Sequence, residues 1–129
     1  MTDAPLPPLL TAQVKAVLDR YDTALASGDS AAVTATFAEF GACYPGDDTA
    51  AFGTDIGPHY RQVCATARPP LRRRVHDIAS GGDVVFVTTT VTPTQETAPT
   101  TPTGELFILR RRAKQWAILA HLGSPGPTP

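Results

Sequence analysis

The first long segment of the chain, residues 9–27, has the hydrophobic spacing of an amphipathic helix. Apolar side chains recur there every three or four positions, at Val14, Val17, Leu18, Tyr21 and Leu25. This spacing places them on one helical face that packs into the core, and Gly28 then ends the helix. Tyr21 therefore needs a hydrogen-bond partner, because burying its hydroxyl unpaired costs about 1–3 kcal/mol.

Two shorter helices are predicted after the first one. The earlier of the two begins near residue 29, with inward positions at Val33, Phe37 and Phe40. The later one covers about residues 56–67, and Tyr60 belongs to its apolar face. Residues 42–44, which include Tyr44, are predicted to form a brief strand between them.

From residue 71 onward the hydrophobic period changes to two, which is typical of strands. Four strands are predicted over residues 71–78, 84–92, 105–111 and 115–122. Helices that precede a run of strands favour an α+β fold, in which three N-terminal helices pack on a curved antiparallel sheet.

The remaining segments have the composition of arms and loops. Residues 1–8 are predicted to form a proline-rich arm, residues 9–124 one domain, and residues 125–129 a tail. The loop over residues 93–103 contains three prolines and one apolar residue, Ala98, so it is either a flexible hairpin tip or a lid.

Charge and hydropathy exclude several classes of partner. The chain has 11 basic and 12 acidic residues, which gives no long-range field for nucleic acid or an anionic membrane. No apolar run approaches the ~20 residues of a membrane span, and the first residues do not resemble a secretion signal. A soluble, cytoplasmic protein is expected.

Two arginine triplets, residues 72–74 and 110–112, are interpreted as solvated charges, with an anion site as the alternative.

The sequence contains no motif for a cofactor or a metal. Nucleotide-binding glycine patterns, the GxSxG motif and the HExxH motif are absent, and the three histidines are not spaced as metal ligands. Cys43 and Cys64 lie in apolar segments and are expected to be reduced, buried thiols. We therefore expect neither a cofactor nor a metal.

Several short motifs resemble the nuclear transport factor 2-like (NTF2-like) superfamily. They are RY at residues 20–21, ALASGD at 24–29, FAE at 37–39, GTDI at 53–56, WAI at 116–118 and HLGS at 121–124. This superfamily has a cone-shaped α+β fold and includes ketosteroid isomerase, scytalone dehydratase, limonene epoxide hydrolase and the SnoaL-like polyketide cyclases. The resemblance covers roughly residues 9–124 and specifies the fold better than the function.

The resemblance to ketosteroid isomerase implies roles for individual residues. Tyr21 matches the tyrosine that donates to the substrate oxyanion, and Tyr60 matches the tyrosine hydrogen-bonded to it. Glu105 falls where that family has a second oxyanion donor, a carboxylic acid kept protonated, which is a known case of this kind. The family's catalytic aspartate aligns with Pro45, so only Asp47 or its neighbour could replace it. True steroid isomerisation is therefore not expected.

Strand alternation and the resemblance together predict a pocket. Glu105 would face inward with Phe107, or else begin its strand as an exposed residue after Gly104. His121, which alternates with Leu119, would be a general base or acid, or a core histidine bonded to the backbone. His59 would lie at the pocket mouth or on the surface. The predicted lining comprises Phe37, Tyr44, His59, Phe86, Thr88, Thr90, Phe107 and Leu119.

Two functional hypotheses follow from this pattern. The first is a cofactor-independent enzyme that transfers protons on a hydrophobic, oxygenated small molecule of polyketide, terpenoid or steroid type, as an isomerase, cyclase or dehydratase. The second is a non-catalytic ligand-binding or assembly module. Trp116, Ile118, Leu106 and Ile108 fall on the strand face opposite the pocket. A homodimer through that sheet face is therefore expected.

Overall fold

The computed structural model describes residues 7–46, 49–67, 70–94 and 102–125. Its first element is the long helix α1 (Pro8–Ser27), which ends at Gly28 in the left-handed conformation, with φ 73°. A five-residue helix, α2 (Ser30–Thr34), follows and is capped by the Asp29 side chain. Helix α3 (Ile56–Cys64) comes after a short 3-10 turn over Gly53–Asp55.

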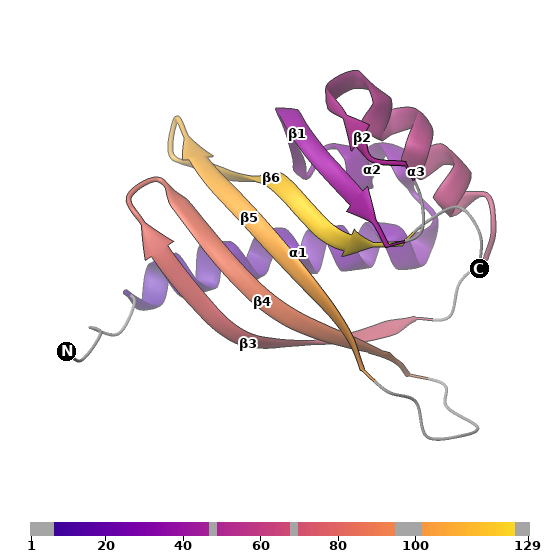
Figure 1. Cartoon of the computed structure of the whole chain (residues 1–129). Helices are drawn as coiled ribbons and strands as arrows, with labels where there is room; N and C mark the ends of the chain where they lie inside the picture. The colour runs from indigo at the N-terminus through magenta and orange to yellow at the C-terminus, as the bar shows by residue number, and fades with distance from the viewer. Residues whose placement is uncertain (1–6, 47–48, 68–69, 95–101, 126–129) are drawn as a thin grey trace.

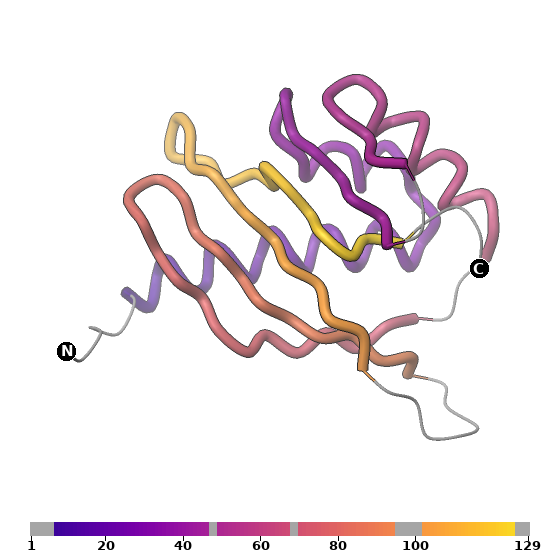
Figure 2. The backbone as a smooth tube through the Cα atoms, viewed as in Figure 1, coloured from indigo at the N-terminus to yellow at the C-terminus, as the bar shows by residue number. Residues whose placement is uncertain are grey.

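The strands form one six-stranded sheet in the order β2-β1-β6-β5-β4-β3. They are β1 (Phe37–Pro45), β2 (Ala51–Phe52), β3 (Leu71–Gly81), β4 (Val84–Pro93), β5 (Thr103–Arg112) and β6 (Gln115–Ser124). Helix α1 crosses one face of this curved sheet, and α3 lies beside β1 and β2 (Figure 1). The tips of the β3–β4 and β5–β6 hairpins lie on the same side of the molecule (Figure 2).

The core forms between α1, α3 and the inner face of the sheet. The predicted face of α1 is confirmed, since Val14, Val17, Leu18 and Tyr21 are at most 2% exposed. Tyr60 is fully buried on α3, as predicted. The α+β class and the four long strands are likewise confirmed.

Two details of the predicted fold are wrong. The second predicted helix shortens to α2, and Phe37 and Phe40 lie on strand β1 instead. Phe37 is 8% exposed and Phe40 is 75% exposed, so burial along this segment alternates as in a strand, with one interruption of the alternation. The sheet is mixed, because β1 pairs with β6 in parallel. Residues 37–45 join the sheet because their inward positions meet the core formed by Tyr21 and Tyr60.

A β-bulge changes which residues of β6 face the core. Leu109 pairs with Ile118 and Ile108 pairs with Ala120, so Leu119 has no partner on β5. An extra residue of this kind shifts the alternation by one position. Trp116, Ile118 and His121 are consequently all buried. The expectation that Trp116 and Ile118 face outward is therefore wrong.

The described residues contain no helix long and apolar enough to cross a membrane. Several predictions fall outside the residues that the structure describes: Asp47, most of the loop over residues 93–103, most of the N-terminal arm and most of the tail.

Candidate functional site

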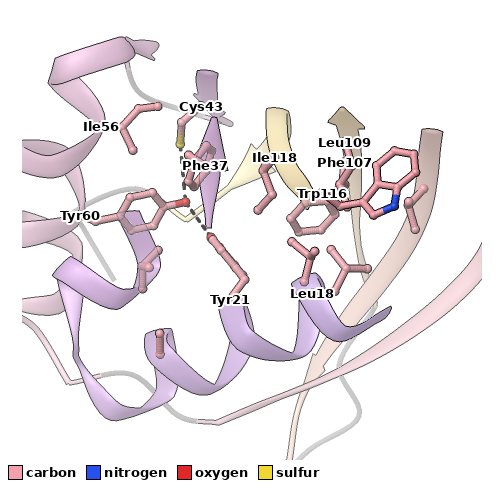
Figure 3. Close-up of a cluster of buried hydrophobic side chains, with 14 of the residues drawn as sticks. Leu18, Tyr21, Phe37, Cys43, Ile56, Tyr60, Phe107, Leu109, Trp116 and Ile118 are labelled. Carbon is pink, nitrogen blue, oxygen red and sulfur yellow. Dashed lines mark hydrogen bonds between the residues drawn. The ribbon is translucent and has the colours of Figure 1, made fainter. Parts of the chain in front are cut away.

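A chain of four polar side chains joins α1, α3, β1 and β6 inside the core. The hydroxyl oxygens of Tyr21 and Tyr60 are 2.7 Å apart. The Sγ of Cys43 lies 3.7 Å from the Tyr60 hydroxyl and 2.8 Å from the Ser124 hydroxyl. Figure 3 shows the part of this chain that runs from Tyr21 through Tyr60 to Cys43. We call these four residues the tyrosine chain.

The environment keeps the tyrosine chain protonated. Burial raises the pKa of Tyr21 and of Tyr60 well above the ordinary value of 10. Burial likewise raises the pKa of the Cys43 thiol. Both phenols are therefore neutral hydrogen-bond donors over the physiological pH range.

A second group, the charged cluster, consists of Asp22, Arg73, Glu105 and His121. Arg73 donates two hydrogen bonds of 2.9 Å to the Asp22 carboxylate. Its Nη1 also donates to the Thr89 hydroxyl at 2.8 Å, and both terminal nitrogens lie 3.4 Å from Glu105 Oε1. Burial lowers the pKa of Arg73, but the bonds to Asp22 and the charge of Glu105 outweigh this and raise it overall.

Glu105 connects Arg73 to His121. Its Oε1 lies 2.5 Å from His121 Nε2 inside the core, where the two side chains are 4% and 0% exposed. The Phe107 ring stacks on the imidazole, with 3.9 Å between ring centroids and an interplanar angle of 16°. The Arg73 guanidinium lies 4.7 Å from the centroid of the same ring. Phe107 therefore contacts both polar groups, the imidazole by stacking and the guanidinium as a cation–π partner.

The protonation state of His121 follows from its partners. Burial lowers its pKa below 6.5, and the hydrogen bond to Glu105 opposes this shift only in part. A neutral imidazole that meets a carboxylate at Nε2 carries its proton there, so we assign the lone pair to Nδ1. Nδ1 is buried and has no hydrogen-bond partner in the part of the chain that the structure describes.

The two groups meet around the Tyr21 ring. It contacts His121 edge to face at 5.1 Å between centroids, and Phe107 at 5.7 Å. Phe37 completes the enclosure, at 6.3 Å from the Tyr21 centroid. On the outer side of Arg73, a groove of about 230 Å³ between α1 and β3 is lined by Asp22, Arg73 and four neighbours.

The predicted site residues divide between the core and the surface. Tyr21, Tyr60, Glu105, His121, Phe37 and Phe107 lie together in the core. Glu105 contacts His121 and Arg73, and no hydrogen bond links it to either tyrosine. His59 is half-buried, with Nε2 3.3 Å from the carbonyl oxygen of Pro125.

Five predicted lining residues do not reach the site. Phe86, Thr88 and Thr90 lie on the outer side of β4, because Val85, Val87, Thr89 and Val91 are the buried residues. The predicted alternation of this strand is therefore reversed. Leu119 is the bulged residue of β6, and Tyr44 on β1 is 40% exposed.

Arg73 and Asp22 were not predicted as site residues. The sequence contains one indication for Arg73, because the alternation of side chains along β3 places it on the opposite face from Arg72 and Arg74, both of which are exposed. Asp22 is the neighbour of Tyr21, but helical spacing gives no reason to place it in the core. No group of three His, Cys, Asp or Glu side chains in the described ranges could hold a metal ion.

Comparisons with known proteins place this geometry in a family. The family model described as SnoaL-like domain matches residues 14–128. The chain therefore belongs to the SnoaL-like domain family, within the NTF2-like superfamily. Among curated proteins, none matches the chain significantly.

Solved structures agree with this fold. A ketosteroid isomerase-like protein from Erwinia carotovora atroseptica is 26% identical, with a TM-score of 0.69, and the match covers 86% of this chain and 92% of that one. A candidate calcium/calmodulin-dependent protein kinase type II association domain from Thiobacillus denitrificans is 22% identical, with a TM-score of 0.76 and coverages of 95% and 98%. An NTF2-like protein of unknown function from Pseudomonas putida is 12% identical, with a TM-score of 0.72 and coverages of 92% and 87%.

Proposed function

We propose that the protein is a cofactor-independent enzyme that transfers a proton on a hydrophobic, oxygenated small molecule. The substrate class is polyketide, terpenoid or steroid, and the reaction is an isomerisation, cyclisation or dehydration. One observation carries this proposal: His121 Nδ1 is buried without a partner among the described residues, on an imidazole that Glu105 holds in place. Buried polar atoms nearly always have partners, so this nitrogen indicates a position for a ligand.

His121 would be the general base. Its Nδ1 lone pair takes a proton from carbon next to a substrate carbonyl, and the imidazolium returns the proton at a second position. Glu105 would orient the ring and stabilise its charged form, which is a different role from the protonated donor that the resemblance implies. The guanidinium of Arg73 supports this assignment, because it lies 3.4 Å from the Glu105 carboxylate and pairs with it.

Tyr21 would stabilise the oxyanion that forms when the proton leaves. If Tyr60 donates to Tyr21, the Tyr21 proton remains available to the substrate oxygen. The raised pKa of Tyr21 keeps that proton in place. One such donor contributes about 10²–10³-fold to turnover in enzymes that use it.

Solvent exchange tests this function without knowledge of the natural substrate. The protein is incubated in D₂O with a panel of β,γ-unsaturated ketones and 1,3-diketones, and deuterium incorporation is followed by NMR. We expect the wild type to accelerate incorporation over a protein-free control, and this acceleration to fall by about 10²–10³-fold for Tyr21→Phe and by about 10²–10⁴-fold for His121→Asn. Tyr44→Phe and His76→Asn, at exposed positions, are the matched controls.

A non-catalytic binding or assembly module is the second candidate. Its support is the close packing of the site, where Tyr21, Tyr60, Phe107 and His121 are all 0% exposed. A substrate would have to displace these side chains to reach Nδ1. Under this alternative, the protein does not accelerate exchange of any ketone in the panel over the protein-free rate, and Tyr21→Phe changes only stability.

For either function we propose a homodimer through the outer face of the sheet. The exposed apolar side chains there are Tyr44, Phe52, Phe86 and Leu122, each 38% to 54% exposed. Strand register aligns Phe86 with Ile108 and Ala120, and Leu106 with Leu122 and Tyr44. Directly paired residues share a sheet face, so these side chains form one apolar surface across four strands.

A further inference from the structure

We propose that a groove at the β5–β6 hairpin is a binding site for a small polyanion. The groove has a volume of about 770 Å³ and lies between α1, the start of β1 and the hairpin. This volume falls within the range of small-molecule sites. None of its lining residues belongs to the tyrosine chain or the charged cluster, and the groove shares only Phe37 with the surroundings of the proposed active site.

The charge of the groove is strongly one-sided. Four cationic side chains line it, Arg20, Arg110, Arg112 and Lys114, against the single acid Glu39. The whole chain, by contrast, has a formal charge of −1. A concave surface lined by cations concentrates anions from solution.

The four cations have no partners among the described residues. Within the described residues, none of their side chains takes part in a hydrogen bond or an ion pair. The middle arginine of the same triplet, Arg111, instead bonds Asp83 at 2.9 Å. Arg110 and Arg112 therefore keep all their donors for a ligand, and a guanidinium binds phosphate or carboxylate through two parallel hydrogen bonds.

The backbone of the hairpin is held in an uncommon conformation at this groove. The turn residues Ala113 and Lys114 have φ values of 51° and 64°, which glycine or asparagine normally supplies. A glycine at position 114 would relieve the strain but would remove a cation from the groove. A two-residue hairpin turn requires positive φ at both positions, and this chain has lysine at position 114 where glycine would adopt that conformation more easily.

Apolar side chains in the groove can contact the apolar part of such a ligand. Val17, Phe37 and Trp116 contribute to the lining. The pairing of β1 with β6 begins at Ile118, so residues 115–117 have no strand partner on that edge within the described ranges. The free backbone groups there can bond to the polar part of a ligand.

The single tryptophan of the chain, Trp116, provides a local signal for binding. Pyrophosphate and citrate are titrated separately at fixed ionic strength, with tryptophan fluorescence and calorimetry as readouts. We expect saturable binding with a dissociation constant below roughly 1 mM. Binding of pyrophosphate alone identifies a phosphate-bearing ligand, citrate alone a carboxylate, and both a general polyanion site.

Matched variants test the location of the site. Arg110→Gln with Arg112→Gln should weaken binding at least about tenfold, because it removes two guanidinium donors. Arg72→Gln with Arg74→Gln removes the same charge from exposed positions of β3 and should leave binding unchanged. Equal losses in both double variants, heat of binding without a fluorescence change, or no saturable binding of either anion would overturn the proposal.

Discussion

Glu105 Oε1 on β5 and His121 Nε2 on β6 lie 2.5 Å apart. The two side chains are close because Phe107 on β5 is the strand partner of His121 on β6. The bulge at Leu119 is the cause of this contact, since without it His121 and Ile118 could not both face the core. A backbone irregularity thus joins the acid and the imidazole.

The depressed pKa of His121 predicts acid sensitivity. Because the folded pKa lies below the unfolded value of 6.5, the unfolded state binds the proton first as the pH falls. The His121 contribution to the free energy of unfolding is therefore present above pH 6.5 and is lost as the pH falls below that value. Urea unfolding at several pH values measures this pH dependence. His121→Gln should flatten it and His76→Gln should not; an unchanged slope in His121→Gln contradicts the assignment.

The two arginine triplets provide a direct comparison of buried and exposed ion pairs. Arg73 and Glu105 have side chains that are 6% and 4% exposed, whereas Arg111 and Asp83 are 46% and 68% exposed. Arg73→Gln leaves Glu105 and Asp22 without their cation and should lower the free energy of unfolding by about 3–5 kcal/mol. Arg111→Gln should lower it by about 0–1 kcal/mol. Chemical denaturation of both variants measures the difference, and equal losses would show that Arg73 is not needed for the charged cluster.

The sequence predicted the parts of the fold that periodicity controls. The apolar face of α1 follows from a hydrophobic period of 3.6 residues, and the four long strands follow from a period of two residues. Tyr21 and Tyr60 were placed in the core by this spacing. Their partnership came from the resemblance to ketosteroid isomerase, because no local pattern links residues that are 39 positions apart.

The errors occur where the backbone departs from regular pairing. The bulge at Leu119 turned Trp116 and Ile118 inward, and the alternation of β4 was assigned to the wrong face. Phe86 and Val87 are both apolar and either could face the core, so residue type alone does not show which of them is buried. Arg73 was missed because a buried arginine depends on partners from other elements, namely Asp22 on α1 and Glu105 on β5.

Tyr21→Phe distinguishes a catalytic network from a structural one. Loss of the hydroxyl removes one hydrogen bond from the tyrosine chain and leaves Tyr60 with a weaker set of partners. In a structural network the free energy of unfolding should fall by about 1–3 kcal/mol. In an enzyme, deuterium incorporation into a ketone should fall by about 10²–10³-fold with little unfolding. Tyr44→Phe, on the exposed side of β1, should change neither quantity.

The outer sheet face predicts the oligomeric state. Phe86 is 44% exposed and pairs with Ile108 on the apolar surface, so a charge there would be buried in the proposed dimer. Phe86→Glu should therefore give a monomer in sedimentation experiments, whereas the wild type should sediment as a dimer at micromolar concentration. Leu9→Glu is the matched control, since Leu9 is 69% exposed on α1, away from this face. A wild-type monomer, or a Phe86→Glu dimer as stable as the wild type, would exclude this interface.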